Sequence, residues 1–131
     1  MKIIHQRPPN YKELKEKFEF DDKITVFAYG DKLYNPSRLR IPIDVMVHEK
    51  VHQRQQEEIG VEVWWRKYLD DVEFRLSQEM EAYRTQYGFV RSKYGEREDY
   101  LGKLADVLCS PVYGNIINKE QALNGIRECL G

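Results

Sequence analysis

The sequence predicts a mainly helical α+β domain with one small β-hairpin. Apolar residues recur three and four positions apart along most of the chain, as they do in helices that pack one face on a core. The run Ile24–Tyr29 is instead β-branched and aromatic, and the turn residues Gly30 and Asp31 follow it. A chain of 131 residues with 41% hydrophobic content is long enough for one core and too short for two. We therefore expect a single domain over residues 1–131.

A short helix is expected before the hairpin. Asn10 stands three residues before Glu13, which is the spacing of a capping box, and Tyr11–Phe18 carries apolar residues at helical spacing. The two strands of the hairpin are then expected in Ile24–Tyr29 and around residues 33–34.

A second helix is expected to begin near Ile43. Pro42 suits the first turn of a helix, where its missing amide hydrogen would have no partner. Ile43, Val47 and Val51 form an apolar stripe on this helix. The two histidines that lie beside this stripe are therefore expected to point towards the protein.

Four further helices are expected after Gly60, which interrupts the helical pattern. The first is an amphipathic piece with Trp64 and Trp65, which are most simply core residues. Either Asp70 or Asp71 can cap the next helix. The remaining predicted elements are that long helix over residues 72–90, a helix over 98–108, a loop over 110–115, and a final helix from the capping pair Asn118 and Gln121 to Leu130.

The composition limits the classes of partner and the compartment. A formal net charge of -1 gives no electrostatic footprint for a nucleic acid or an anionic membrane. No eighteen apolar residues follow one another, and Met1–Pro9 lacks the apolar run of a signal peptide. Cys109 and Cys129 have no metal or redox spacing and read as reduced, partly buried thiols. We expect a cytoplasmic protein that binds neither nucleic acid nor membrane.

One pentapeptide, His48-Glu49-Lys50-Val51-His52, holds two of the three histidines and a carboxylate. Positions four apart on a helix lie about 40° apart on one face, so both rings can reach one metal ion. Glu49 stands where it can reach a metal-bound water without being a ligand. This spacing predicts the zinc site of an H-E-x-x-H hydrolase. The alternative is a solvated helix that carries two unrelated histidines.

A catalytic zinc needs three protein ligands, so a third must come from elsewhere in the chain. Glu79 and Glu81 are the candidates. Glu79 lies about 20° from the edge of the apolar arc of its helix, whereas Glu81 lies near the opposite side. Glu79 is therefore expected to face inward, where a dication would supply its counter-charge. The alternative is a surface ion pair between Glu79 and Arg75, one turn earlier.

The pattern of His48, Glu49 and His52, followed by Glu79 and then Ala82 three residues later, resembles the gluzincin metallopeptidases. In that family a glutamate from a second helix completes the zinc site. The resemblance implies that His48, His52 and Glu79 bind zinc and that Glu49 is the catalytic base.

A closer similarity is to small gluzincin-like domains with a HExxHxxQ motif, which Gln55 matches, and a downstream E-x-E-A-Y-R segment, which residues 79–84 match. Such minimal domains recur in bacterial and phage genomes. The similarity covers residues 24–87 and does not extend to the C-terminal region. It implies a minimal zincin-like fold in a bacterial cytoplasm, or in a host cytoplasm if a phage encodes the protein.

The chain departs from the family at Tyr83. Many peptidases of this type have Ala-Asp shortly after the ligand glutamate, and the Asp is a hydrogen-bond partner of a ligand histidine. Tyr83 lies one turn beyond Glu79, so its hydroxyl can replace that hydrogen bond or stabilise an oxyanion. Simple core packing is the alternative. Gln55 and Gln56 can line the mouth of the site, but we expect them to be ordinary solvated glutamines.

The leading functional hypothesis is a zinc-dependent metallopeptidase-like hydrolase. Zinc would activate a water, Glu49 would accept its proton, and the attack would fall on a carbonyl of a peptide or protein substrate. The edge of Ile24–Tyr29 could pair with an extended peptide. The alternative from a different class is a metal-binding structural or interaction protein without turnover. The third possibility is a metal-free helical adaptor. It ranks last, because both the histidine motif and the inward position of Glu79 would then have arisen by coincidence.

Overall fold

The structure is a computed structural model, and it describes residues 1–128. Cys129 and Leu130, on which the sequence places a thiol and the end of the last helix, lie outside the described residues. The fold is a mainly helical α+β arrangement with a small sheet, as predicted. The helices are α1 (Tyr11–Lys17), α2 (Ile43–Ile59), α3 (Val61–Asp70), α4 (Val72–Tyr94), α5 (Glu98–Leu108), the 3₁₀ turn η1 (Pro111–Tyr113) and α6 (Lys119–Arg127).

The sheet has three strands, in the order β1, β3, β2. β2 (Phe27–Tyr29) and β3 (Lys32–Tyr34) form the predicted antiparallel hairpin, in which Ala28 is opposite Leu33. Gly30 adopts a φ of +65°, which a residue without a Cβ adopts readily in such a turn. β1 (Lys2–Ile4) pairs in parallel with β3 and was not predicted, because three residues show no alternation and the pairing joins distant parts of the chain.

The first hairpin strand is shorter than the sequence suggests. Ile24 is 73% exposed, and its amide donates to the carbonyl of Asp21 in a turn. The hydroxyl of Thr25 donates to the same carbonyl, at 2.7 Å. These local bonds hold residues 21–25 out of the sheet, so β2 begins only at Phe27.

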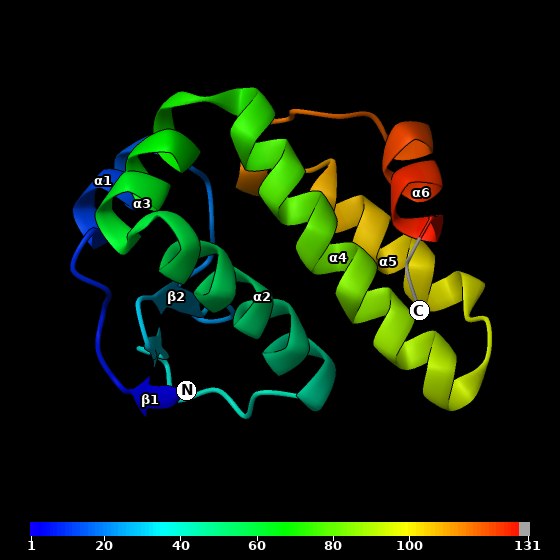
Figure 1. The fold of residues 1–131 in the computed structure, drawn as a ribbon, viewed down its shortest axis with the longest axis horizontal. Coiled ribbons are helices and arrows are strands. Elements are labelled where there is room, and N and C mark those ends of the chain that lie inside the picture. The colour runs from blue at the N-terminus through cyan, green and yellow to red at the C-terminus, as the bar shows by residue number, and fades with distance from the viewer. Residues whose placement is uncertain (129–131) are drawn as a thin grey trace.

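α4 is the central element of the fold. Figure 1 shows it running diagonally, with α2 and α3 on one side and α5 and α6 on the other, in agreement with the contacts between these helices. Gly60, with a φ of +96°, lets the chain turn between α2 and α3. Asp71 then caps α4 by accepting a hydrogen bond from the amide of Phe74. The turns at Gly60 and Asp71 thus bring the chain back, so that α4 lies beside α2.

Two hydrophobic clusters flank this pair of helices. One joins α4 to α5 and α6 around Tyr87, Leu101 and Leu108. The other joins α1, the hairpin and α3 around Leu14, with the predicted core residue Trp64 fully buried. Together they place the contact between α2 and α4 inside the protein.

Of the two capping boxes that the sequence predicts, one forms and the other does not. Asn118 and Gln121 make the predicted capping box of α6. The prediction of a capping box at Asn10 is wrong: α1 does follow it, but its side chain makes no cap hydrogen bond. Its backbone has φ -98° and ψ 20°, outside the extended region from which a capping side chain usually reaches the helix amides.

The predicted apolar stripe of α2 is correct only in part. Val51 is buried beside the two histidines, whereas Ile43 is 64% exposed, because the first turn of α2 extends beyond the core.

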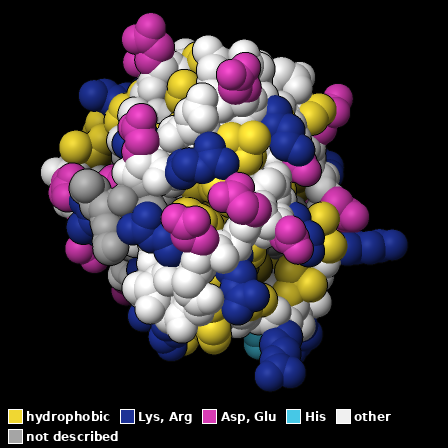
Figure 2. All heavy atoms as spheres, turned by 90° about the vertical axis from the view of Figure 1, so that its right-hand side faces the viewer, with side chains coloured by type: hydrophobic (Ala, Val, Ile, Leu, Met, Phe, Trp, Pro, Cys, Tyr) yellow, Lys and Arg dark blue, Asp and Glu magenta, His cyan; other side chains and the backbone are white. Residues whose placement is uncertain are grey.

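Cys109 is half-buried, as predicted. In residues 1–128 no helix combines the length and hydropathy that a membrane crossing requires. Lys and Arg side chains are interspersed with Asp and Glu on the face in Figure 2, which shows no patch of one charge sign.

Candidate metal centre

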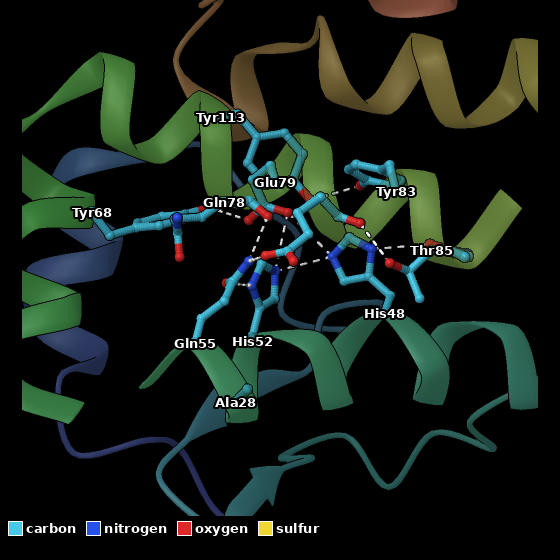
Figure 3. A network of polar contacts seen from close by, with 12 residues as sticks. Ala28, His48, His52, Gln55, Tyr68, Gln78, Glu79, Tyr83, Thr85 and Tyr113 are labelled. Atoms are coloured by element: carbon cyan, nitrogen blue, oxygen red, sulfur yellow. Dashed lines mark hydrogen bonds and ion pairs between the residues drawn. The ribbon is translucent and has the colours of Figure 1, made fainter. Parts of the chain in front are cut away.

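Three side chains meet in the buried contact between α2 and α4. The Nε2 atoms of His48 and His52 lie 3.1 Å apart, and they lie 3.2 and 3.1 Å from Oε1 of Glu79. All three residues are buried. Figure 3 shows both rings rising from α2 towards the carboxylate that descends from α4. These three residues, which the sequence predicts to be ligands, can together hold a metal ion.

Helix geometry explains which carboxylate enters the site. Glu79 is 3% exposed, whereas the side chain of Glu81 is 46% exposed and lies at 2.5 Å from Arg54. The inward and outward assignments are therefore confirmed. The alternative ion pair with Arg75 is wrong, since that guanidinium is buried and donates to the carbonyls of Tyr68, Leu69 and Tyr113.

Gln55 fixes the ring of His52. Its Oε1 lies 2.8 Å from Nδ1 of His52. Its Nε2 donates to the carbonyl of Gln78 and to Oε1 of Glu81, so the amide cannot be turned round without losing both bonds. Oε1 of Gln55 must accept, and Nδ1 of His52 therefore carries the proton.

Gln86 fixes the ring of His48 in the same way. Its Oε1 lies 3.0 Å from Nδ1 of His48, and its Nε2 donates to the hydroxyl of Tyr100 at 2.9 Å and to Asp44 at 3.3 Å. Tyr100 in turn donates to Asp44 at 2.7 Å. The carboxylate of Asp44 thus anchors a chain of bonds that leaves Nδ1 of His48 as the donor.

These two bonds leave three hydrogen-bond acceptors facing one another in the site. With both Nδ1 atoms protonated, the lone pairs of both neutral Nε2 atoms face Oε1 of Glu79. The other carboxylate oxygen, Oε2, is occupied by the hydroxyl of Tyr68 at 2.5 Å. Two nitrogens and one oxygen with no donor between them repel one another unless a cation lies among them. Two imidazoles and one carboxylate therefore fit a bound metal ion.

A proton can take the place of the metal. Burial lowers the pKa of His52, but the charge of Glu79 overcomes burial and raises it to about 9. Burial raises the pKa of Glu79, but His52 and His48 overcome it and hold this pKa well below its usual value. Without a metal, the pair therefore shares one proton at neutral pH, and a metal ion must displace it.

Glu49 stands beside the three candidate ligands without joining them. It is buried and lines the same pocket as His48, His52 and Glu79. Burial raises the pKa of its carboxyl, although the two histidines act in the opposite direction. A carboxylate with a raised pKa beside a metal site is suited to accept a proton.

The pocket has a volume of about 100 Å³ and is mainly aromatic. α3 contributes Trp64, Trp65 and Tyr68, and the hairpin side contributes residues 25–28. The three candidate ligands also line this pocket, and the rings of Trp64 and His52 have centroids 5.3 Å apart.

Tyr83 contacts the site through its ring. The ring lies across that of His48, with centroids 4.4 Å apart, and its hydroxyl pairs with that of Tyr113 at 2.7 Å. Burial and the charge of Glu79 raise the pKa of Tyr83 well above its usual value, so it stays protonated. The hydroxyl of Tyr83 pairs with Tyr113 rather than with a ligand histidine, and Gln86 and Gln55 accept from Nδ1 of His48 and of His52 instead.

The prediction of solvated glutamines at Gln55 and Gln56 is wrong. Gln55 holds His52, and Gln56 donates to the carbonyl of Ala28 and accepts from the amide of Gly30. Both are buried because α2 packs against α4 on one side and β2 on the other.

Sequence reasoning also missed two partners of the site. Gln86 lies seven residues after Glu79, two helical turns along the same face, so helical spacing alone could have indicated it. Tyr68 lies on another helix, and no spacing indicates its bond to Glu79.

Comparisons with protein-family models, with curated proteins and with solved structures found no match to this chain. The assignment of the site therefore depends on its own geometry.

Metal binding should depend on Glu79 and not on Glu81. Glu79→Ala removes the oxygen that faces both Nε2 atoms, so the purified variant should lose stoichiometric metal after reconstitution. Glu81→Ala is the matched control: it removes a partner of Gln55 and of Arg54 but no atom that faces the two Nε2 atoms, and Gln55 keeps its bond to the carbonyl of Gln78, so metal content should persist. Elemental analysis measures both, and loss of the metal in Glu81→Ala with retention in Glu79→Ala would contradict the site.

The stability of the metal-free protein should fall as the pH rises from 6.5 to 9. The pKa of His52 rises from 6.5 to about 9 on folding, so its contribution is complete below pH 6.5 and is lost through pH 9. The loss can reach about 3 kcal/mol, as 1.36 kcal/mol per pKa unit implies. Denaturant titrations at both pH values test this.

Metal-loaded protein is the control for that series. A bound metal replaces the proton, so its stability should not fall over this interval. Identical pH dependence in the two forms would contradict a proton and a metal competing for one position.

Proposed function

We propose that the protein is a zinc-dependent metallopeptidase-like hydrolase of the gluzincin type. The observation that carries the proposal is the position of Glu49, a buried carboxylate in one pocket with His48, His52 and Glu79. A purely structural zinc site usually closes its fourth position with a protein ligand and needs no base. In residues 1–128 only these three His, Cys, Asp or Glu residues form such a group.

The metal would be held by Nε2 of His48, Nε2 of His52 and Oε1 of Glu79. Two nitrogens and one oxygen are a donor set that zinc accepts in hydrolases. Bound there, zinc would lower the pKa of a water and polarise a substrate carbonyl. Gln55, Gln86 and Tyr68 would hold the three ligands in place through the hydrogen bonds described above.

Glu49 performs the proton transfers in this proposal. Its carboxylate accepts a proton from the attacking water and delivers it to the leaving nitrogen of the peptide bond. The raised pKa of its carboxyl makes the second transfer easier. The aromatic walls formed by Trp64 and Tyr68 keep bulk water from the reacting groups. The partner is a peptide or protein substrate.

One observation favours the alternative, a metal-binding structural or interaction protein without turnover. β2 lies at the edge of the sheet where an extended peptide substrate would pair, but part of this edge is already occupied. Gln56 already bonds the carbonyl of Ala28 and the amide of Gly30 on this strand and its turn. A substrate that pairs with β2 must therefore use the remaining part of the edge or displace Gln56.

Glu49→Gln separates the two functions. The amide is nearly isosteric and cannot accept the proton, so the variant should keep its metal and fold and lose peptidase activity by at least about a hundredfold. Cleavage of a diverse peptide library, followed by mass spectrometry, measures this. Glu57→Gln, an exposed change on the same helix, is the matched control and should cleave as the wild type does.

Cleavage by Glu49→Gln at the wild-type rate would contradict a mechanism in which Glu49 transfers the proton. Absence of cleavage by metal-loaded wild type would favour the interaction protein.

A further inference from the structure

The metal centre is almost closed to solvent. His48, Glu49, His52 and Glu79 are each between 3% and 9% exposed. The pocket beside them has a volume of about 100 Å³, whereas drug-sized ligands occupy pockets of about 300 to 1,000 Å³. A polypeptide chain is larger than such ligands, so the pocket does not hold one as it stands. A wall of the pocket must therefore move before a peptide bond can reach Glu49.

We propose that residues 11–25, which are α1 and the segment that leads to β2, form a lid that opens to admit a polypeptide. The identity of the substrate rests on the proposed function, whereas the movement is a property of the fold. Leu14, Phe18 and Phe20 of the lid line the pocket together with the three candidate ligands and Glu49. Figure 1 shows α1 at the margin of the molecule, beside α3 and away from α5 and α6.

The polar bonds of the lid are mostly internal. The hydroxyl of Tyr11 donates to the carboxylate of Asp22, at 2.7 Å and 2.6 Å from its two oxygens. The ammonium group of Lys15 donates to the carbonyl of Phe20 at 3.0 Å and lies 3.7 Å from Asp22. In residues 1–128 one side-chain hydrogen bond joins the lid to the rest of the fold, from the hydroxyl of Ser37 to the carbonyl of Asp22. The lid can therefore move as one unit.

Apolar contacts hold the lid against the pocket. The rings of Phe18 and Tyr68 meet edge to face with centroids 6.0 Å apart, and those of Phe20 and Phe27 with centroids 5.3 Å apart. Leu14 is 3% exposed and belongs to the same hydrophobic cluster. Such contacts have no fixed direction. They can be lost and made again without leaving a buried polar group unpaired.

The α3 wall of the pocket is tied to α4 by polar bonds instead. The indole of Trp64 donates to Gln78 at 2.8 Å, and the hydroxyl of Tyr68 donates to Glu79 at 2.5 Å. The guanidinium of Arg75 donates to the carbonyl of Tyr68 at 2.8 Å. Movement of α3 away from α4 would break all three bonds, and movement of α2 would separate the candidate ligands themselves.

The two remaining walls are tied in the same way. On the hairpin side, the amide of Gln56 holds the carbonyl of Ala28 and the amide of Gly30 to α2. On the side of η1, the hydroxyl of Tyr113 pairs with that of Tyr83. Of the walls around the pocket, the lid therefore loses the fewest polar bonds when it moves.

α1 is also weakly secured as a helix. It spans seven residues, and a helix of two turns has little stability of its own. Asn10 makes no cap hydrogen bond, whereas Asp71 and Asn118 cap α4 and α6. Parts of a fold that are held in this way open locally before the whole protein unfolds. The open fraction then sets how fast the site can be reached.

The first test is the release of zinc from the full chain to excess EDTA. Leu14→Ala removes a contact that only the closed lid makes, so release should be at least about tenfold faster than in the wild type. Leu104→Ala is the matched control, because Leu104 is buried in the cluster that joins α4 to α5 and α6. It should lower the melting temperature by a comparable amount and leave the release rate unchanged.

A milder variant covers the case in which Leu14→Ala does not fold. Ser37→Ala removes the hydrogen bond between the lid and the rest of the fold at an exposed position, so release should be about threefold to tenfold faster. Ser92→Ala removes a hydroxyl that donates to the carbonyl of Phe89 on α4. It is the matched control and should release zinc at the wild-type rate.

The metal-free protein provides a measurement that does not depend on zinc. Diethyl pyrocarbonate acylates imidazole nitrogens, and mass spectrometry locates the label. His48 and His52 should be labelled faster in Leu14→Ala and in Ser37→Ala than in the wild type or the two controls. His5 is exposed and should be labelled at one rate in all five proteins.

Unchanged labelling in both lid variants, or an equal rise in the controls, would overturn the lid. Peptide cleavage by a protein with that result would overturn the lid alone. Faster release and labelling in the lid variants of a protein that cleaves no peptide would contradict the proposed function and leave the lid standing.

Discussion

The fold is organised around a repulsion that a cation relieves. Two imidazole nitrogens and a carboxylate oxygen lie within 3.2 Å of one another in a buried space between α2 and α4. Lone pairs held this close, away from water, destabilise the contact of the two helices unless a positive charge lies among them. A proton can serve, as the raised pKa of His52 indicates, and a metal ion serves both histidines at once. The central helix pair is therefore also the site.

The surrounding bonds make the arrangement specific. Gln55 and Gln86 each present an oxygen to one imidazole, and each is prevented from turning by bonds on its amide nitrogen. Tyr68 occupies the second oxygen of Glu79 from α3. Supports from α2, α3 and α4 thus aim three lone pairs at one point before any ion arrives. Such preorganisation reduces the cost of ordering the ligands on binding.

Local patterns in the sequence predicted the helices, the hairpin and the three residues that meet. Helical periodicity was sufficient because His48 and His52 share one face of a single helix, and because the apolar arc of α4 distinguishes Glu79 from Glu81. The need of a metal ion for a third ligand predicted that these two helices meet, but the other contacts between distant segments were not predicted. β1 is found only through its pairing with β3, and the roles of Gln56 and Tyr68 depend on how helices and sheet pack together.

The most direct test of the central claim is anomalous diffraction at the zinc absorption edge from crystals of the zinc-loaded protein. The geometry predicts one peak between α2 and α4, about 2.0 to 2.2 Å from Nε2 of His48, Nε2 of His52 and Oε1 of Glu79. It also predicts that no fourth protein atom lies at that distance. A zinc-loaded crystal without a peak at this position, or with the ion held by other residues, would contradict the account.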